Sequence, residues 1–377
     1  MKSALRGFAA LMLSAAPVMA GGLERAPQSI AILFEEGNYA ELGFGRAKPS
    51  ISGQDTALFG GSSFGNVSDA YNFFSLGYKH QFSPNLSVAF IVEQPFGADI
   101  RYPAASIALG GTAVTVDSTT YTALLRYKFD NNFGVHGGLR GSTADGNVTL
   151  SGMAYSSLNG YNVTLDSDTG WGYAIGASWE KPEIAARVSL TYNSPVSHDF
   201  RTVETINGNP INPAGSSNTE IDTPKSWNLE FQTGVAPDTL VFGSVRWVEW
   251  SAFRVEPAIF ANIPSPTTGQ PLGSLVELED STTYTLGVAR KFTENWSGAA
   301  SFSWEKSGND LVSPLAPTNG RRGITLAGIY TQDNFKVTAG INYTKLGDST
   351  PATAGTARAE MTDNDFVGVG IKIGYSF

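Results

Sequence analysis

The sequence predicts an all-β protein, a transmembrane antiparallel β-barrel of about fourteen strands with a short N-terminal plug segment. Apolar residues alternate with small or polar residues in segment after segment, and short turns alternate with long polar stretches. Beyond residue 20, no stretch approaches the ~18 uninterrupted apolar residues of a transmembrane helix. Because every backbone N–H and C=O group in hydrocarbon needs an internal partner, a spanning chain of this kind has to form a closed barrel.

The N-terminus resembles an export signal. Lys2 and Arg6 give it a positive start, an apolar core follows over residues 8–16, and Val18-Met19-Ala20 is a cleavage site of small residues. The chain is therefore predicted to comprise a signal peptide at 1–20, a short plug segment at 21–37 and the transmembrane barrel at 38–377.

Alternation with a period of two is clear in at least three segments. In residues 119–129, 170–180 and 335–344, large apolar side chains occupy one face, and small, polar or charged side chains occupy the other. The outward residues of the first segment are Tyr121, Ala123, Leu125, Tyr127 and Phe129. Aromatic residues at both ends of such faces are typical of strands that cross the two membrane interfaces. A soluble sandwich also alternates but needs no aromatic strand ends.

Connections of two kinds follow each other along the chain. Tight turns are predicted near residues 83–85, 130–132, 181–183, 236–238, 293–295 and 332–334. Long polar loops are predicted at residues 53–68, 103–116, 151–161, 203–218, 257–276, 309–319 and 349–362. Short periplasmic turns and long external loops are typical of outer-membrane barrels. The count is about fourteen strands, with both termini on the periplasmic side.

The C-terminal segment supports this topology. Ile371, Ile373, Tyr375 and Phe377 alternate with small or polar residues, and the sequence ends on an aromatic residue. This pattern resembles the signal that the barrel assembly machinery recognises at the C-terminus of outer-membrane barrels, with Phe377 as its final residue. An edge strand of a soluble protein is the alternative.

Composition argues against catalysis and against nucleic acid as a partner. The net charge is −9, whereas a phosphate backbone requires a basic surface. There is no cysteine, and the three histidines, His80, His136 and His198, have no metal-ligand spacing. His198-Asp199 is interpreted as a surface pair at the external end of a strand. No nucleophile elbow or phosphate-binding loop occurs, so we expect no enzyme activity, metal or cofactor.

Several segments resemble the FadL/TodX (OmpP1) family of outer-membrane transporters for long-chain fatty acids and aromatic hydrocarbons. They are residues 93–103 (EQPFGADIRYP), 224–230 (PKSWNLE), 242–253 (FGSVRWVEWSAF) and 280–296 (DSTTYTLGVARKFTENW). The resemblance implies a monomeric, fourteen-stranded barrel with an N-terminal plug. It also implies capture of an apolar ligand by the external loops, binding in the lumen, and sideways release through a gap at a kinked third strand.

Pro95, Phe96 and Gly97 are the predicted lateral gate. Proline removes a donor from the strand ladder and glycine permits a bulge, so these residues can interrupt pairing in the third strand. The alternative is that they mark the end of a strand entering its external loop.

The sequence departs from the family at its N-terminus. Only residues 21–35 precede the first predicted strand, and Arg25-Ala26-Pro27-Gln28 stands where the family has an Asn-Pro-Ala motif. Either the path through the lumen is more open, or Ile30, Ile32, Leu33 and Phe34 form a minimal stopper.

By alternation, four arginines face inward: Arg126, Arg140, Arg187 and Arg246. The lumen suits them, because a charge on the lipid face at midplane costs ~2–4 kcal/mol. Ion pairs inside the lumen with Glu180 or Glu230 are one interpretation. The other is that an arginine binds a carboxylate headgroup. On this basis the candidate ligand-binding residues are Arg246, Phe242, Val248, Trp250 and Arg140.

The sequence thus predicts uptake of hydrophobic small molecules, most simply fatty acids, across the outer membrane of a Gram-negative bacterium. A surface-exposed structural or binding barrel, or a general porin, is the alternative. Arg321 and Arg322 are assigned to an external loop, where contact with lipopolysaccharide or simple solvation are both open. Membrane lipid and lipopolysaccharide are the other expected partners.

Overall fold

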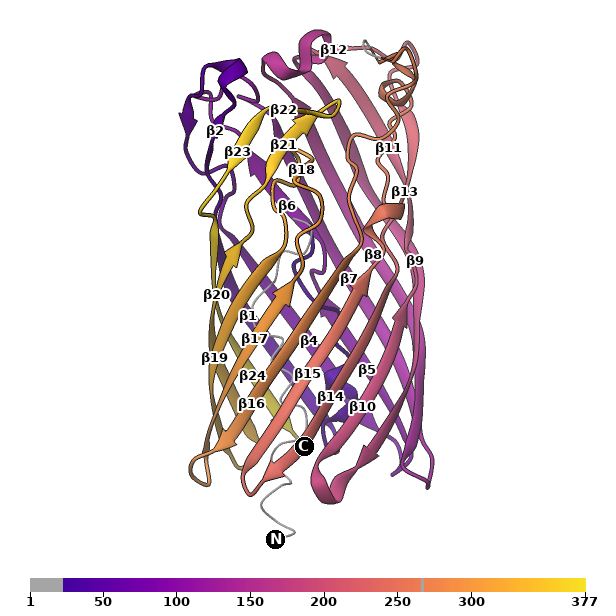
Figure 1. Ribbon diagram of the computed structural model, residues 1–377. Helices are drawn as coiled ribbons and strands as arrows, with labels where there is room; N and C mark the ends of the chain where they lie inside the picture. The colour runs from indigo at the N-terminus through magenta and orange to yellow at the C-terminus, as the bar shows by residue number, and fades with distance from the viewer. Residues whose placement is uncertain (1–22, 266–267) are drawn as a thin grey trace.

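The computed structural model describes residues 23–265 and 268–377, and these form a closed β-barrel (Figure 1). The wall contains fourteen antiparallel strands, as predicted, within the described residues. It closes where β1 (Tyr39–Ser50) pairs with β24 (Asp365–Ser376) along their whole length. In the described part of the chain, no helix is long and apolar enough to cross a membrane.

The remaining strands are β2 (Gly53–Asp55), β3 (Ser63–Phe64), β4 (Tyr71–Gln81), β5 (Leu86–Glu93), β6 (Gly97–Arg101), β7 (Ala113–Lys128), β8 (Phe133–Leu150), β9 (Tyr161–Lys181), β10 (Ala186–Asn193), β11 (Ser197–Ile206), β12 (Asn209–Pro210), β13 (Ser217–Asp222), β14 (Ser226–Ala236), β15 (Thr239–Val248), β16 (Ser281–Lys291), β17 (Trp296–Glu305), β18 (Leu311–Val312), β19 (Arg321–Gln332), β20 (Phe335–Leu346), β21 (Thr350–Thr353), β22 (Thr356–Ala357) and β23 (Ala359–Met361). Short 3-10 helices are η2 (Ala31–Phe34), η3 (Ala57–Phe59), η4 (Met153–Leu158), η5 (Pro182–Ile184), η6 (Trp250–Ala252) and η7 (Phe260–Asn262).

The two ends of the barrel differ as the turn pattern predicts. The six tight turns lie at one end, the turn end, together with the start of β1 and the end of β24. The loops lie at the other, the loop end, where Figure 1 shows β2, β12 and β21–β23 above the wall. All six predicted turns join consecutive wall strands.

Two predicted loops were too long. β7 already begins at Ala113 inside the predicted loop 103–116, and β11 continues to Ile206 inside the predicted loop 203–218. Both strands extend toward the loop end, where outward positions such as Thr115 and Asp117 are polar. Polar residues at these outward positions remove the apolar outer face although the backbone ladder continues, so the sequence pattern ends before the strand does.

The outer face of the wall is apolar. Tyr121, Leu125 and Tyr127 on β7, and Trp171 and Tyr173 on β9, are all 40–70% exposed, as their predicted outward parity requires. Inward neighbours on the same strands, such as Thr122 and Ala174, are buried. The exposed side chains are those that a hydrocarbon environment favours, which fits a wall embedded in the membrane.

Three wall strands are interrupted at mid-height. The third consists of β5 and β6 with residues 94–96 between them, and β10/β11 and β13/β14 are broken at 194–196 and 223–225. β6 resumes its ladder with β7 after the first interruption. Pro95–Gly97 therefore breaks a strand within the wall and does not mark the entry to an external loop.

Arg321 lies in the wall, contrary to its assignment to an external loop. It is the first residue of β19 and pairs with Leu346 of β20. Its side chain is buried and forms an ion pair with Glu305 at 3.0 Å. Arg322 has the opposite parity and is exposed. The reason is again that the strands extend beyond the apolar band.

Candidate functional site in the barrel lumen

An apolar cavity lies inside the barrel at the level of the strand interruptions. The space between its lining atoms measures about 920 Å³, which includes the part open to solvent, and the cavity is narrow. Its lining includes Leu23, Phe96, Val114, Val116, Val148, Leu165, Phe200, Ile221, Trp250, Phe253, Val255, Val276 and Leu315.

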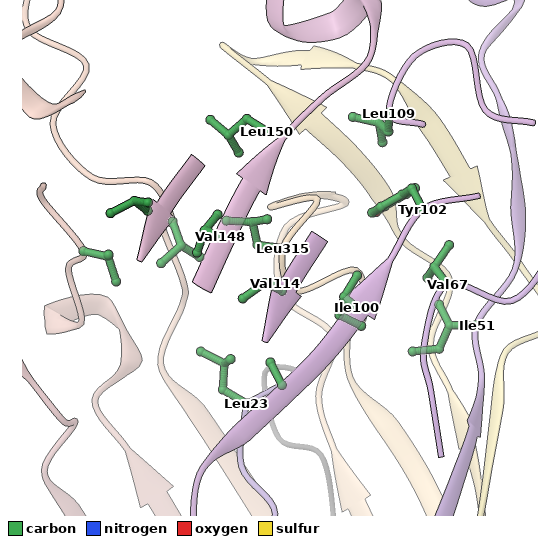
Figure 2. Packing of buried hydrophobic residues seen from close by; sticks show 14 of the residues in the cluster. Leu23, Ile51, Val67, Ile100, Tyr102, Leu109, Val114, Val148, Leu150 and Leu315 are labelled. Atoms are coloured by element: carbon green, nitrogen blue, oxygen red, sulfur yellow. The ribbon is translucent and has the colours of Figure 1, made fainter. Parts of the chain in front are cut away.

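The lining residues come from distant parts of the chain. Val114 and Val148 project from the neighbouring strands β7 and β8, and Leu315 reaches down from the loop between β17 and β19; Figure 2 shows the three meeting within one cluster. β-branched residues at alternate positions give each strand an apolar inward face here, where the lumen of a porin would be polar. The lumen at this height therefore favours an apolar ligand.

The cavity extends to both sides of the barrel. Phe96 and Gly97 line it at the interruption of the third strand, and Thr223 and Pro224 line it at the interruption between β13 and β14. A proline cannot donate to a ladder, so breaks of this kind are where a wall can lose pairing.

His198 is buried in the cavity wall, contrary to its interpretation as a surface pair with Asp199. Consecutive residues of a strand point to opposite faces, so His198 faces inward and Asp199 is exposed. The imidazole stacks on Phe200, with ring centroids 5.2 Å apart, and its Nδ1 lies 3.4 Å from an Asp168 carboxylate oxygen. Its Nε2 is buried without a hydrogen-bond partner.

Trp250 lines the cavity. Its ring packs edge-on against Phe96 and Phe253, with centroids 5.8 and 5.9 Å away. Its Nε1–H donor is buried without a partner. Val248 belongs to the apolar cluster around the cavity, whereas Phe242 packs with Leu240 in a separate cluster nearer the turn end. Of the three predicted apolar ligand residues, only Trp250 is in the cavity lining.

The predicted anchor Arg246 already has a partner. Its guanidinium forms a buried ion pair with Glu24 of the N-terminal segment, and it also donates to Ser226 Oγ at 3.1 Å. Arg140, two residues below the lining residue Ser142 on the inward face of β8, is only 3% exposed. Among the described residues it has neither a hydrogen bond nor an ion pair within 4.0 Å.

Arg126 and Arg187 lie lower in the lumen, and both contact the ring of Phe34. Their guanidinium carbons are 4.7 and 4.2 Å from the centre of the Phe34 ring. Arg126 also forms an ion pair with Glu180, as one of the two interpretations of the inward arginines expected.

The N-terminal segment, residues 23–38, runs inside the barrel. Ile30, Ile32, Leu33 and Phe34 are buried, mostly within η2, and pack on inward residues of the wall such as Leu124. Nearer the loop end, Leu23 reaches the cavity. Burial of these side chains follows from the hydrophobic effect, because the lumenal face of the wall offers apolar contacts at this height.

Pairing in the wall fails beside Pro95. β4 pairs with β5 over Leu76–Gln81 only, so Tyr71–Ser75 have no ladder partner in the third strand. The amide of Phe74 bonds instead to the side chain of Gln94 at 3.2 Å. Pairing returns at the bridge between Ser68 and Ile100. The wall therefore has a bounded gap in its backbone pairing, and the cavity residues Phe96 and Gly97 lie beside it.

The sequence reasoning missed Leu23, Glu24 and Arg25. All three contact the interrupted strand or the cavity wall, through a bridge between Glu24 and Phe96 and through backbone hydrogen bonds to residues 95 and 97. No periodic pattern marks them, because an irregular segment has no preferred face. The one available signal was the presence of two charges in a segment expected to be a hydrophobic stopper.

These features define a class of protein: an outer-membrane β-barrel with an apolar binding cavity and an interrupted wall. The chain belongs to the family described as outer membrane protein transport protein (OMPP1/FadL/TodX), whose model matches residues 65–377. The members of this family are transport channels of the outer membrane. No curated protein matches the sequence.

Solved structures show the same fold at low sequence identity. A Pseudomonas aeruginosa FadL homologue superposes with a TM-score of 0.71 at 13% identity, covering 92% of each chain. The Pseudomonas putida toluene transporter TodX superposes with a TM-score of 0.63 at 12% identity, covering 95% of this chain and 97% of that one.

Proposed function

We propose that this protein takes up hydrophobic small molecules, long-chain fatty acids above all, by binding them in the lumenal cavity and releasing them sideways through the gap beside Pro95. The observation that carries the proposal is the continuity of an apolar cavity with a break in the wall. A structural barrel needs neither feature, and a general porin needs a polar lumen.

Polar groups at the cavity favour a ligand with a polar head. Trp250 Nε1 and His198 Nε2 are buried without partners, and the guanidinium of Arg140 lies just below. Buried polar atoms are rarely left unpaired, so a ligand that pairs them binds with additional free energy. A carboxylate accepts from the indole and guanidinium donors, and from the imidazole when Nε2 carries a proton, whereas a plain hydrocarbon accepts from none of them.

Arg140 is a better anchor than Arg246. Glu24 already neutralises Arg246, and a second carboxylate would have to displace it. Glu93 interacts electrostatically with Arg140 but makes no ion pair with it, so the guanidinium keeps its donors. A bidentate contact with a fatty-acid headgroup would satisfy them.

Oleate binding to the detergent-purified protein tests the proposal. Hydrogen bonds to charged groups contribute ~1.5–3 kcal/mol, so Arg140→Gln should weaken oleate binding about 10- to 100-fold. Toluene binding should change little, because it lacks a headgroup. Arg201→Gln, at an exposed ion pair with Asp166, is the matched control.

Equal oleate affinity of the wild type and Arg140→Gln would remove Arg140 from the site. Tight toluene binding without oleate binding would assign aromatic hydrocarbons as the ligand class. Uptake of labelled oleate by cells with and without the protein separates transport from binding alone.

The N-terminal segment supports a further part of the proposal, that it plugs the lumen. Phe34 and its neighbours fill the lumen below the cavity. Deleting residues 21–34 should therefore raise single-channel conductance in a planar bilayer. An unchanged conductance would show that the segment does not block ion flow.

A further inference from the structure

We propose that the side chain of Arg25 closes the gap in the wall, and that a ligand leaves sideways only when this side chain moves. The Arg25 side chain in this position is called the bolt. The inference rests on the proposed lateral release and adds the group that controls it. The probe described below reports on the gap itself, so the two ideas can fail separately.

Backbone hydrogen bonds place Arg25 at the gap. The amide of Arg25 donates to the carbonyl of Pro95 at 2.7 Å, and the amide of Gly97 donates to the carbonyl of Leu23 at 2.8 Å. The N-terminal segment thus pairs with the interrupted third strand through a single antiparallel bridge, between Glu24 and Phe96. Residue 25 therefore stays at the height where the β4 ladder is unpaired.

The Arg25 side chain then bridges the two edges of the gap. On one edge its guanidinium carbon lies 4.2 Å from the centre of the Tyr71 ring, at the unpaired end of β4. On the other edge Nη1 forms an ion pair with Asp117 of β7 at 3.2 Å. The guanidinium thus contacts both strands that the broken third strand fails to join.

Gly97 makes room for this arrangement. A Cβ atom at position 97 would collide with the Arg25 guanidinium, so the guanidinium can occupy this place only beside a glycine and an alanine would displace it. Gly97 pairs with Asp117 in the β6–β7 ladder. The guanidinium of Arg25 therefore lies against this ladder at the Gly97–Asp117 pair.

The bolt runs from the lumen toward the outside of the wall. Asp117 has outward parity, like Tyr121 on the same strand, and its side chain is 60% exposed, whereas that of Arg25 is only 7% exposed. A lumenal residue can reach an outward carboxylate only where the wall is open. The ion pair itself therefore passes through the gap.

The contacts are suited to a bolt that can be withdrawn. An ion pair with a largely exposed carboxylate is weak and screened by salt, and a cation–π contact adds only a modest amount. The next residue toward the N-terminus, Glu24, is held by the buried ion pair with Arg246. Arg25 can therefore leave the gap while the segment stays docked.

A single cysteine provides a direct probe, because the natural chain contains none. Val116→Cys places a bimane label on the cavity lining beside Ala98, and spin-labelled lipids in the bilayer quench it when the gap admits them. Arg25→Ala, which removes both contacts, should shift the closed–open ratio about five- to thirty-fold toward quenching, and Asp117→Asn, which removes only the ion pair, should shift it up to about fivefold. Arg25→Lys should retain part of the closure.

Gly97→Ala tests the same idea with every charge in place, because it displaces the guanidinium sterically. Arg201→Ala, which removes an exposed ion pair far from the gap, should leave quenching unchanged. Heat-modifiable migration on gels verifies that each variant is folded. Quenching equal to wild type in Arg25→Ala and Gly97→Ala would overturn the proposal. Increased quenching without faster oleate uptake would uphold the bolt and refute lateral release.

Discussion

The buried ion pair between Glu24 and Arg246 provides the most quantitative prediction about the N-terminal segment. Both side chains are less than 10% exposed, so solvent does not screen their interaction. Removing one member of a buried pair leaves an uncompensated charge and costs ~3–5 kcal/mol. Arg246 would keep its bonds to Ser226 and Asn228, which places the cost of Glu24→Ala near ~3 kcal/mol.

The lost free energy weakens the binding of the N-terminal segment to the wall, because Arg246 belongs to the wall and Glu24 belongs to the segment. A loss of ~3 kcal/mol raises the undocked fraction about 100-fold. Single-channel recordings in planar bilayers should therefore show frequent large openings in Glu24→Ala that are rare in the wild type. The double variant Glu24→Gln/Arg246→Met removes both charges and should restore mostly closed channels. If recordings from Glu24→Ala matched those of the wild type, the ion pair between Glu24 and Arg246 would not hold the N-terminal segment in the lumen.

Three further predictions concern the wall and the cavity. Leu139→Arg places a charge at an outward position that is 64% exposed. At the midplane of the bilayer this charge should lower the free energy of unfolding in lipid vesicles by ~2–4 kcal/mol, which urea titration measures. An unchanged urea midpoint would place residue 139 outside the hydrocarbon. Trp250→Phe keeps the ring but removes the unpaired Nε1–H, and should weaken oleate binding about fivefold while sparing toluene; an equal effect on both ligands would show that packing alone was lost. Phe34→Ala removes the ring between Arg126 and Arg187 and should increase ion conductance, whereas Phe34→Tyr should not.

Much of the wall was predictable because the barrel repeats one local rule. Lipid on one side and lumen on the other impose a period of two, and Tyr121, Leu125 and Tyr127 follow it without tertiary information. The turns were predictable for a similar reason, since residues such as Pro182 and Asp333 favour a bend locally. The first residues of β7 and the last residues of β11 were not, because they lie outside the apolar band.

The lumen was only partly predictable. Parity placed Arg140 and Arg246 inside the barrel, but it could not say which of them would find a carboxylate. That depended on Glu24, which is 222 residues away in sequence and lies in an irregular segment. His198 was misplaced because the pair with Asp199 was judged by its proximity in sequence, although adjacent strand residues face opposite ways. Only the alternation, applied consistently, would have corrected this.

The long strands have a consequence for the first encounter with a ligand. β9 has 21 residues, which at about 3.3 Å per residue and a tilt of about 40° rise roughly 50 Å, twice the ~25 Å apolar band. The strand is therefore long enough to extend well beyond the bilayer on the loop side, and Figure 1 shows β9 running up to the loop end of the barrel. A water-insoluble molecule arriving from the medium meets this rim first and need not dissolve in the saccharide coat that surrounds it.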